Sequence, residues 1–195
     1  MNENLQEVVT ENIPVSPAPA RPSPRRTALA MGRELVVTIL PAVVMALLIQ
    51  FFLAQSTIVF GQSMEPNLHQ DQRLVVEKVS YRWHGPQRGD IVVLPDPSGG
   101  PIPLIKRVVG LPGERVNIAA GRVYVDGAAL DEPYLAQITT GEGRSWQVPP
   151  MQVFVMGDNR GDSRDSRYFG PVSIETLVGH AVFRLWPLDK FGIVH

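Results

Sequence analysis

The chain has no cysteine, and its 195 residues carry a formal net charge of only -1. The missing cysteine excludes disulfides, thiolate metal sites and a cysteine nucleophile. It leaves the redox compartment open, because a cysteine-free chain is compatible with either side of a membrane. A net charge so close to zero provides no general field that would attract nucleic acid. We therefore expect no nucleic-acid partner.

Common nucleotide and metal motifs are also absent. The sequence contains neither a Gly-x-x-x-x-Gly-Lys loop nor a His-Glu-x-x-His pair. Its histidines are isolated from one another, at His69, His84, His180 and His195. We expect no metal and no cofactor, although a histidine site assembled from distant segments stays open at this stage.

Charge is lacking altogether between Leu35 and Ala54. A helix of about 20 residues rises about 30 Å, which matches the hydrocarbon core of a bilayer. We therefore predict a transmembrane helix over residues 35–54, with a buried core helix as the alternative. Residues 1–34 include a stretch rich in proline, alanine and serine, so we predict a disordered tail there.

The distribution of basic residues predicts how this helix is oriented. Arg21, Arg25, Arg26 and Arg33 precede it, whereas the first lysine or arginine after it is Arg73. The positive-inside rule places the N-terminus in the cytoplasm and residues 55–195 outside it. The length of the apolar run favours an uncleaved signal-anchor over a cleaved signal peptide. A plasma membrane and a thylakoid membrane fit equally well.

The sequence of residues 55–195 predicts a mostly β domain. Short runs rich in valine, isoleucine and leucine alternate with clusters of glycine, proline and aspartate, which is typical of an all-β sandwich or barrel. Asp126-Gly127 predicts a tight turn, and residues 115–150 look like a small β-ribbon insertion. The only helical turn we expect begins at Ser173 as N-cap and ends at Gly179.

Ser63 is a candidate nucleophile because it follows the apolar run by nine residues, within Gly61-Gln62-Ser63-Met64-Glu65-Pro66. Glu65 excludes Gly-x-Ser-x-Gly, and Pro66 excludes Ser-x-x-Lys. On its pattern alone, a Gly-x-Ser segment is more often a turn than a catalytic site.

Lys106 is the candidate base for that serine. An exposed lysine is almost entirely charged at neutral pH and becomes a base only when burial disfavours its charge. Lys106 lies in an apolar run, and on a strand it shares a face with Leu104 and Val108 while Arg107 points away. The alternative is a surface lysine on an edge strand.

A third cluster, residues 157–170, mixes acidic, basic and turn-forming residues. It fits either a solvated loop with weak surface ion pairs or an ordered loop that orients a catalytic side chain.

Four segments together resemble the boxes of the type I signal peptidases, which use a Ser/Lys dyad. They occur in family order at residues 61–68, 88–94, 106–114 and 157–170. The resemblance implies a signal-peptidase-like β-sheet or barrel catalytic domain with one N-terminal transmembrane helix. It makes Ser63 the nucleophile and Lys106 the general base.

The resemblance also implies roles for six other residues. Ser163 would hydrogen-bond and orient the lysine, Asp165 and Arg167 would form an ion pair behind the site, and Asp158 would be a structural acid. Met64 would pack near the dyad. Gly61 stands where some members have a serine that helps to bind the oxyanion, so the oxyanion hole would rely on backbone N–H groups, that of Ser63 first.

The function implied is a membrane-bound serine endopeptidase that removes signal peptides from secretory preproteins. It would cut after small residues, as in Ala-x-Ala, and act as a monomer on extended peptides paired to a strand edge near Ser63 and Leu104. Alternatives are a non-enzymatic, membrane-anchored β-domain and a self-cleaving repressor-type protease. The apolar run and the lack of a DNA-binding helix pair argue against the second. We expect three large aromatic residues to be core rather than membrane-facing: Trp83, Trp186 and Phe191.

Overall fold

The computed structural model describes residues 24–48 and 54–194, and the chain divides into two compact units, residues 1–44 and 45–195. Helix α1 (Pro24–Leu48) contains Pro41. Its first residue is a proline, whose fixed φ suits the start of a helix. The helix therefore takes in residues 24–34, where we had expected disorder.

The predicted membrane span differs from α1 at both ends. Residues 49–53 lie outside the described part of the chain, as do residues 1–23, and Ala54 is the first residue of strand β1. Among the described residues, no helix combines the length and the apolar character needed to cross a membrane.

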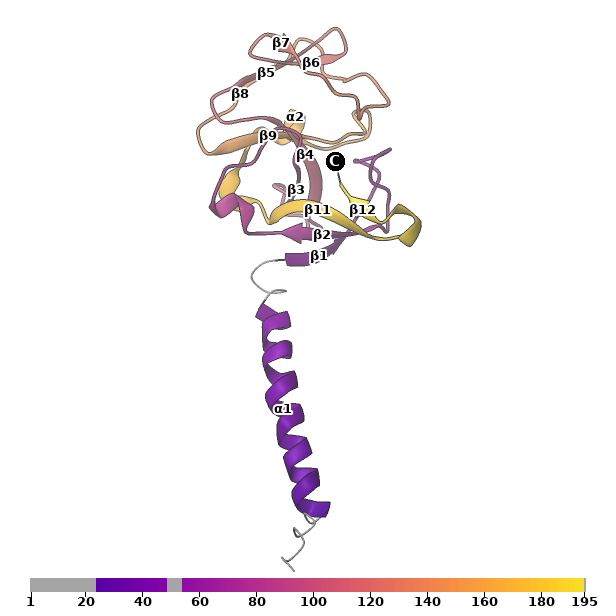
Figure 1. Cartoon of the computed structure of the whole chain (residues 1–195). Coiled ribbons are helices and arrows are strands. Elements are labelled where there is room, and N and C mark those ends of the chain that lie inside the picture. The colour runs from indigo at the N-terminus through magenta and orange to yellow at the C-terminus, as the bar shows by residue number, and fades with distance from the viewer. Residues whose placement is uncertain (1–23, 49–53, 195) are drawn as a thin grey trace, which may run out of the picture. The chain divides into compact units, whose positions relative to one another are not determined.

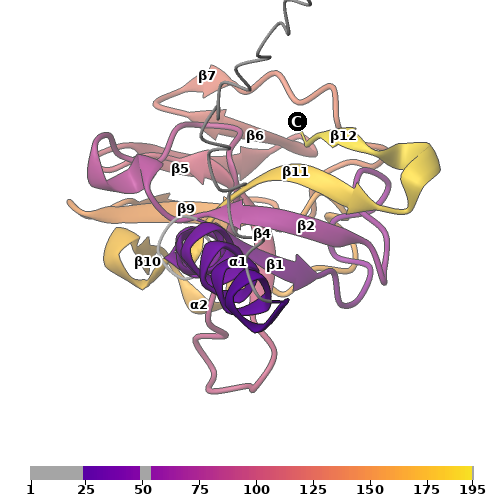
Figure 2. The same cartoon turned by 60° about the horizontal axis from the view of Figure 1, so that its bottom comes forward.

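The predicted mostly β fold is confirmed. The larger sheet has eight strands in the order β1-β2-β11-β3-β4-β9-β10, with β12 paired to β11, and Figure 2 shows β2 and β11 side by side. Its strands are β1 (Ala54–Ile58), β2 (Arg73–Glu77), β3 (Ile91–Leu94), β4 (Leu104–Gly110), β9 (Gln152–Met156), β10 (Val172–Ser173), β11 (Gly179–Trp186) and β12 (Gly192–Ile193). Short helical turns lie between them: η2 (Ser80–Arg82), α2 (Ser166–Phe169), η3 (Ile174–Thr176) and η4 (Leu188–Lys190).

Residues 115–147 form a second, four-stranded sheet where we expected a β-ribbon. Its order is β7-β6-β5-β8, and Figure 1 shows it at the end of the domain opposite β1. The strands are β5 (Arg115–Ala119), β6 (Arg122–Val125), β7 (Ala128–Ala129) and β8 (Ser145–Gln147). Asp126 and Gly127 connect β6 to β7 with φ values of 49° and 84°. Two positive φ angles define the tight hairpin turn that we predicted.

Strand β4, which carries Lys106, is an inner and almost entirely buried strand of the larger sheet. Strand β2 alternates exposed or half-buried with buried positions, as expected for a strand with one face on the core. The four residues of β3 and all but the first of β4 are buried, because β4 pairs with β3 on one side and β9 on the other. Because Lys106 itself is 2% exposed, the alternative of a surface lysine on an edge strand is wrong.

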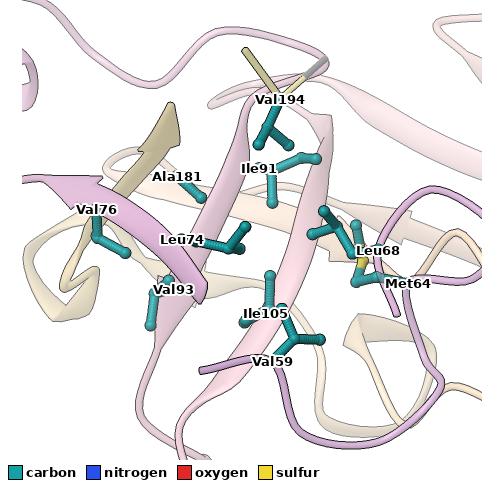
Figure 3. Close-up of a cluster of buried hydrophobic side chains, with 10 residues drawn as sticks. All are labelled: Val59, Met64, Leu68, Leu74, Val76, Ile91, Val93, Ile105, Ala181 and Val194. Atoms are coloured by element: carbon teal, nitrogen blue, oxygen red, sulfur yellow. The ribbon is translucent and has the colours of Figure 1, made fainter. Parts of the chain in front are cut away.

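An apolar cluster joins the loop that follows β1 to the central strands. Met64 and Leu68 come from this loop and pack with Ile105 of β4 and other buried side chains, as Figure 3 shows. Each member of the cluster is at most 9% exposed. Burying such side chains contributes about 1.5–3 kcal/mol each, which is enough to hold the loop against β4.

Two smaller expectations had different outcomes. Ser173 caps η3 as predicted, because its side chain accepts a hydrogen bond from the Glu175 N–H, but η3 ends at Thr176 rather than at Gly179. The expectation that the three aromatics belong to the core is wrong, since Trp83, Trp186 and Phe191 are 84%, 52% and 59% exposed.

Candidate active site

The structure brings Ser63 and Lys106 into direct contact. Nζ of Lys106 lies 2.6 Å from Oγ of Ser63 and 3.0 Å from the carbonyl oxygen of Ile105. Each dyad residue has a sequence neighbour, Met64 or Ile105, in the same buried apolar cluster. The core that folds the domain therefore also fixes the distance between the two functional groups.

Lys106 is 2% exposed, and its face of β4 is apolar as predicted. Leu104 and Val108 pack in one cluster, whereas Ile105 belongs to another. Burial lowers the pKa of Lys106 from 10.5 to about 8, against the opposing effect of the nearby carboxylates of Asp165 and Asp158. At pH 7 about a tenth of such lysines are neutral, compared with about one in 10³ of exposed ones.

The loop after β9 approaches Ser63 closely through Gly157. A Cβ on Gly157 would lie 2.2 Å from Oγ of Ser163 and 2.4 Å from the carbonyl oxygen of Ser63. Only glycine fits between these groups without displacing them. Two residues later, the N–H of Asn159 donates to the same Ser63 carbonyl at 3.0 Å. The loop is thus bonded to the backbone of Ser63.

Asp165 and Arg167 form the expected buried ion pair, with 2.8 Å between Nη2 and Oδ2. Asp165 also accepts hydrogen bonds from the N–H of Gly157 at 3.0 Å and from Oγ of Ser163 at 2.8 Å. The Ser163 hydroxyl therefore bonds to Asp165, and the described residues show no hydrogen bond between Ser163 and Lys106. The expectation that Ser163 orients the lysine stays a prediction, since the hydroxyl is seen here donating to Asp165.

Asp158 joins both halves of the dyad. Its two carboxylate oxygens accept hydrogen bonds from Nε and Nη2 of Arg107 at 2.8 and 2.7 Å, and Oδ2 also accepts from Asn67 at 2.8 Å. Arg107 follows Lys106 on β4, and Asn67 lies in the turn that begins at Ser63. We predicted that Asp158 is a structural acid, and its carboxylate forms a buried ion pair with Arg107.

Gly61 adopts a φ of 76°, and a Cβ there would have no atom within 4 Å. Backbone conformation, rather than lack of space, therefore favours glycine at this position. Met64 is 1% exposed and fills the core beneath the loop. These two residues shape the backbone on either side of Ser63.

Several buried partners were missed by the sequence reading. Arg107 was noticed only because it alternates with Lys106, and Asn67 and Glu132 were not singled out. Arg160 is the largest side chain among those less than 2% exposed. A charged residue inside an otherwise apolar strand was a signal for Arg107, whereas the pairing of Glu132 with Arg160 across 28 positions leaves no local signal.

Comparison with known proteins places the chain in a family. The family model described as signal peptidase, peptidase S26, matches residues 32–186, which is more than half of the chain. The chain belongs to this signal peptidase family. The resemblance carried by the four boxes is thus confirmed, and the chain is a serine endopeptidase that removes signal peptides. The alternative of a non-enzymatic binding domain is set aside.

Individual relatives match most of the chain. The probable signal peptidase I-2 of Synechocystis sp. is 39% identical, covering 95% of this chain and 86% of the relative. The signal peptidase I of Leptolyngbya laminosa is 37% identical, covering 98% and 96%. A crystal structure of signal peptidase I from Enterococcus faecalis V583 is 37% identical and covers 49% of this chain and 95% of that chain, with a TM-score of 0.43.

Proposed function

We propose that Ser63 is the nucleophile and Lys106 the general base of signal-peptide cleavage in this chain. The observation that carries the proposal is the 2.6 Å contact between Oγ and Nζ, made by a lysine that is only 2% exposed. When Lys106 is neutral, the Ser63 hydroxyl donates its proton to Nζ as Oγ attacks the scissile carbonyl carbon. The charged Lys106 then protonates the leaving amine.

Deacylation uses the same pair. Lys106, neutral again after losing its proton to the amine, takes a proton from water as the water oxygen attacks the acyl-enzyme carbonyl. The bond between the carbonyl carbon and Oγ of Ser63 then breaks, and the charged Lys106 returns the proton to Oγ, which releases the acyl fragment as a carboxylic acid and restores the free enzyme. The negative charge on the carbonyl oxygen in each step needs N–H donors. We assign the first to the N–H of Ser63, since Gly61 has no side chain to contribute a hydroxyl.

The substrate binds as an extended strand beside β4. Strand β9 pairs with β4 from Arg107 onward, so the described register leaves the β9-facing edge of Leu104 and Ile105 without a strand partner. A peptide added at this edge would place its carbonyls beside the dyad. We assign to this edge preproteins with small residues before the cut, as in Ala-x-Ala.

The bilayer supplies these substrates. We propose that residues 35–54, which carry no charge, anchor the chain as a single-pass signal-anchor with a cytoplasmic N-terminus. The catalytic domain is then extracytoplasmic, acts as a monomer and meets signal peptides as they leave the membrane.

The test uses full-length protein in detergent with a purified preprotein. Wild type is expected to release the mature protein, whereas Ser63→Ala and Lys106→Ala each lower kcat/KM by at least about 10³-fold, as removal of a catalytic-unit residue does elsewhere. Cleavage by both variants at the wild-type rate would refute the dyad. Protease fragments of intact vesicles report the topology, and protection of residues 1–23 on the same side as the catalytic domain would refute the orientation.

A further inference from the structure

A buried ion pair that the proposed chemistry does not use supports the loop after β9. Arg160 is 1% exposed, and its Nη1 donates to Oε2 of Glu132 at 3.0 Å, while Nη2 contacts Oε1. The side chain of Glu132 is 7% exposed. Glu132 lies outside the larger sheet, in the segment that follows β7, so the pair joins the small sheet to the catalytic loop.

Arg160 connects this ion pair to the loop residues that contact Ser63. Its Nε donates to the carbonyl oxygen of Gly157 at 3.0 Å. Gly157 is the residue with no room for a Cβ beside the Ser63 carbonyl, and Asn159 donates to that carbonyl at 3.0 Å. The loop residues on which Arg160 acts are therefore those in contact with the nucleophile.

A second path leads from Glu132 to the lysine side of the dyad. The Tyr134 hydroxyl donates to Oε1 of Glu132 at 2.8 Å, and the guanidinium of Arg107 lies over the Tyr134 ring, 4.1 Å from its centroid. The Tyr134 carbonyl accepts a hydrogen bond from Asn67 at 2.9 Å. Glu132 is thus connected to the residue after Lys106 and to the turn that carries Ser63.

We propose that Glu132 is a positioning residue for the Ser63–Lys106 dyad and acts through Arg160. The inference rests on the proposed function of that dyad. Among the described contacts of the Arg160 guanidinium, Glu132 is the only anion, the others being the Gly157 carbonyl and the Thr139 hydroxyl. A guanidinium that loses its carboxylate inside the protein has to find water or another partner. Its movement releases the Gly157 carbonyl and loosens the loop against Ser63.

The experiment compares Glu132→Gln with a matched control in full-length protein. Glu142 lies in the same segment between β7 and β8 but is exposed, and its carboxylate accepts hydrogen bonds from the N–H groups of Ala120 and Gly121 at 2.7 and 3.4 Å. Preprotein cleavage is followed at a temperature at which both variants are folded. We expect Glu132→Gln to lower kcat about tenfold or more, with KM within about twofold, because small displacements of reacting groups affect chemistry before binding. Glu142→Gln is expected to keep the wild-type kcat.

A double-mutant cycle tests the route of action. If Glu132 acts through Arg160, adding Glu132→Gln to Arg160→Gln costs less than about twofold further in kcat, since coupled residues are not additive. A wild-type kcat for folded Glu132→Gln, or full additivity in the cycle, overturns the inference.

Two controls keep the result decisive. If Glu132→Gln does not fold, Tyr134→Phe removes only one hydrogen bond to Glu132 and is expected to lower kcat about threefold, the order of one net hydrogen bond. An unchanged kcat in that variant overturns the inference. If wild type itself fails to cleave, the proposed function is refuted and the inference falls with it. If wild type cleaves the preprotein and Glu132→Gln has the same kcat, the inference about Glu132 is refuted, whereas the proposed function of the dyad is not.

Discussion

Replacing Lys106 with methionine should stabilise the protein while abolishing cleavage. Methionine keeps a long, unbranched side chain in the apolar face of β4 but removes the buried charge. The native lysine has a pKa of about 8 against an ordinary value of 10.5, mainly because of burial. Each pKa unit corresponds to about 1.4 kcal/mol, so holding the charged lysine in the native state costs about 3–4 kcal/mol.

The dependence on pH separates this cost from ordinary packing. Since the folded-state pKa lies below the unfolded one, the unfolded chain binds more protons between pH 8 and 10.5, and wild-type stability rises with pH in that window. Below about pH 8 the full cost is present. The free energy of unfolding of Lys106→Met should therefore exceed that of wild type most at pH 7. That advantage should shrink by about 3 kcal/mol as the pH approaches 10.5.

The assay is urea unfolding of both full-length proteins in the same detergent, followed by tryptophan fluorescence at pH 7, 8, 9 and 10. All other titrating groups are common to the two chains, so their effects largely cancel in the difference. A stability difference independent of pH would refute the claim that Lys106 is held in a site that disfavours its charge. Substitution by Arg at the exposed Lys190 is a suitable control, because it keeps the charge and should show no such trend.

Two further substitutions test the loop. Gly157→Ala places a methyl group against the Ser63 carbonyl and the Ser163 hydroxyl. It should lower kcat/KM about 100-fold or more, while circular dichroism shows that the fold is retained. A kcat/KM close to that of wild type would contradict the close approach of Gly157 to Ser63. Asp158→Ala breaks the buried pair with Arg107, 2.7 Å at its shortest, and should lower the free energy of unfolding by about 3–5 kcal/mol in urea. An unchanged urea midpoint would show that this pair does not stabilise the native state.

The sequence was informative where a local pattern has a physical period or a fixed order. Alternation along β4 correctly placed Lys106 with Leu104 and Val108, and Asp126-Gly127 correctly predicted a hairpin turn. Such patterns involve only a few neighbouring residues, so they can be recognised without knowledge of the tertiary structure.

Contacts that depend on the folded loops, or that join distant segments of the chain, could not be predicted from the sequence. The Ser163 hydroxyl donates to Asp165, two residues further along the loop, and this contact depends on the conformation of the loop. Glu132 meets Arg160 only because the small sheet returns to the catalytic loop. Trp186 and Phe191 were expected in the core from the average burial of aromatic residues, but Trp186 is the last residue of β11, Phe191 follows η4, and both are exposed.

The most direct test of the account is the titration of Lys106 itself. The chain has only three lysines, Lys78, Lys106 and Lys190, so labelling lysine with ¹³C at Cε gives a spectrum simple enough to assign by the signal lost in Lys106→Ala. The account predicts that the Lys106 signal titrates with a pKa of about 8, and that kcat rises with pH over the same range. A Lys106 pKa near 10.5, with kcat independent of pH between 6 and 9, would contradict the assignment of Lys106 as the general base.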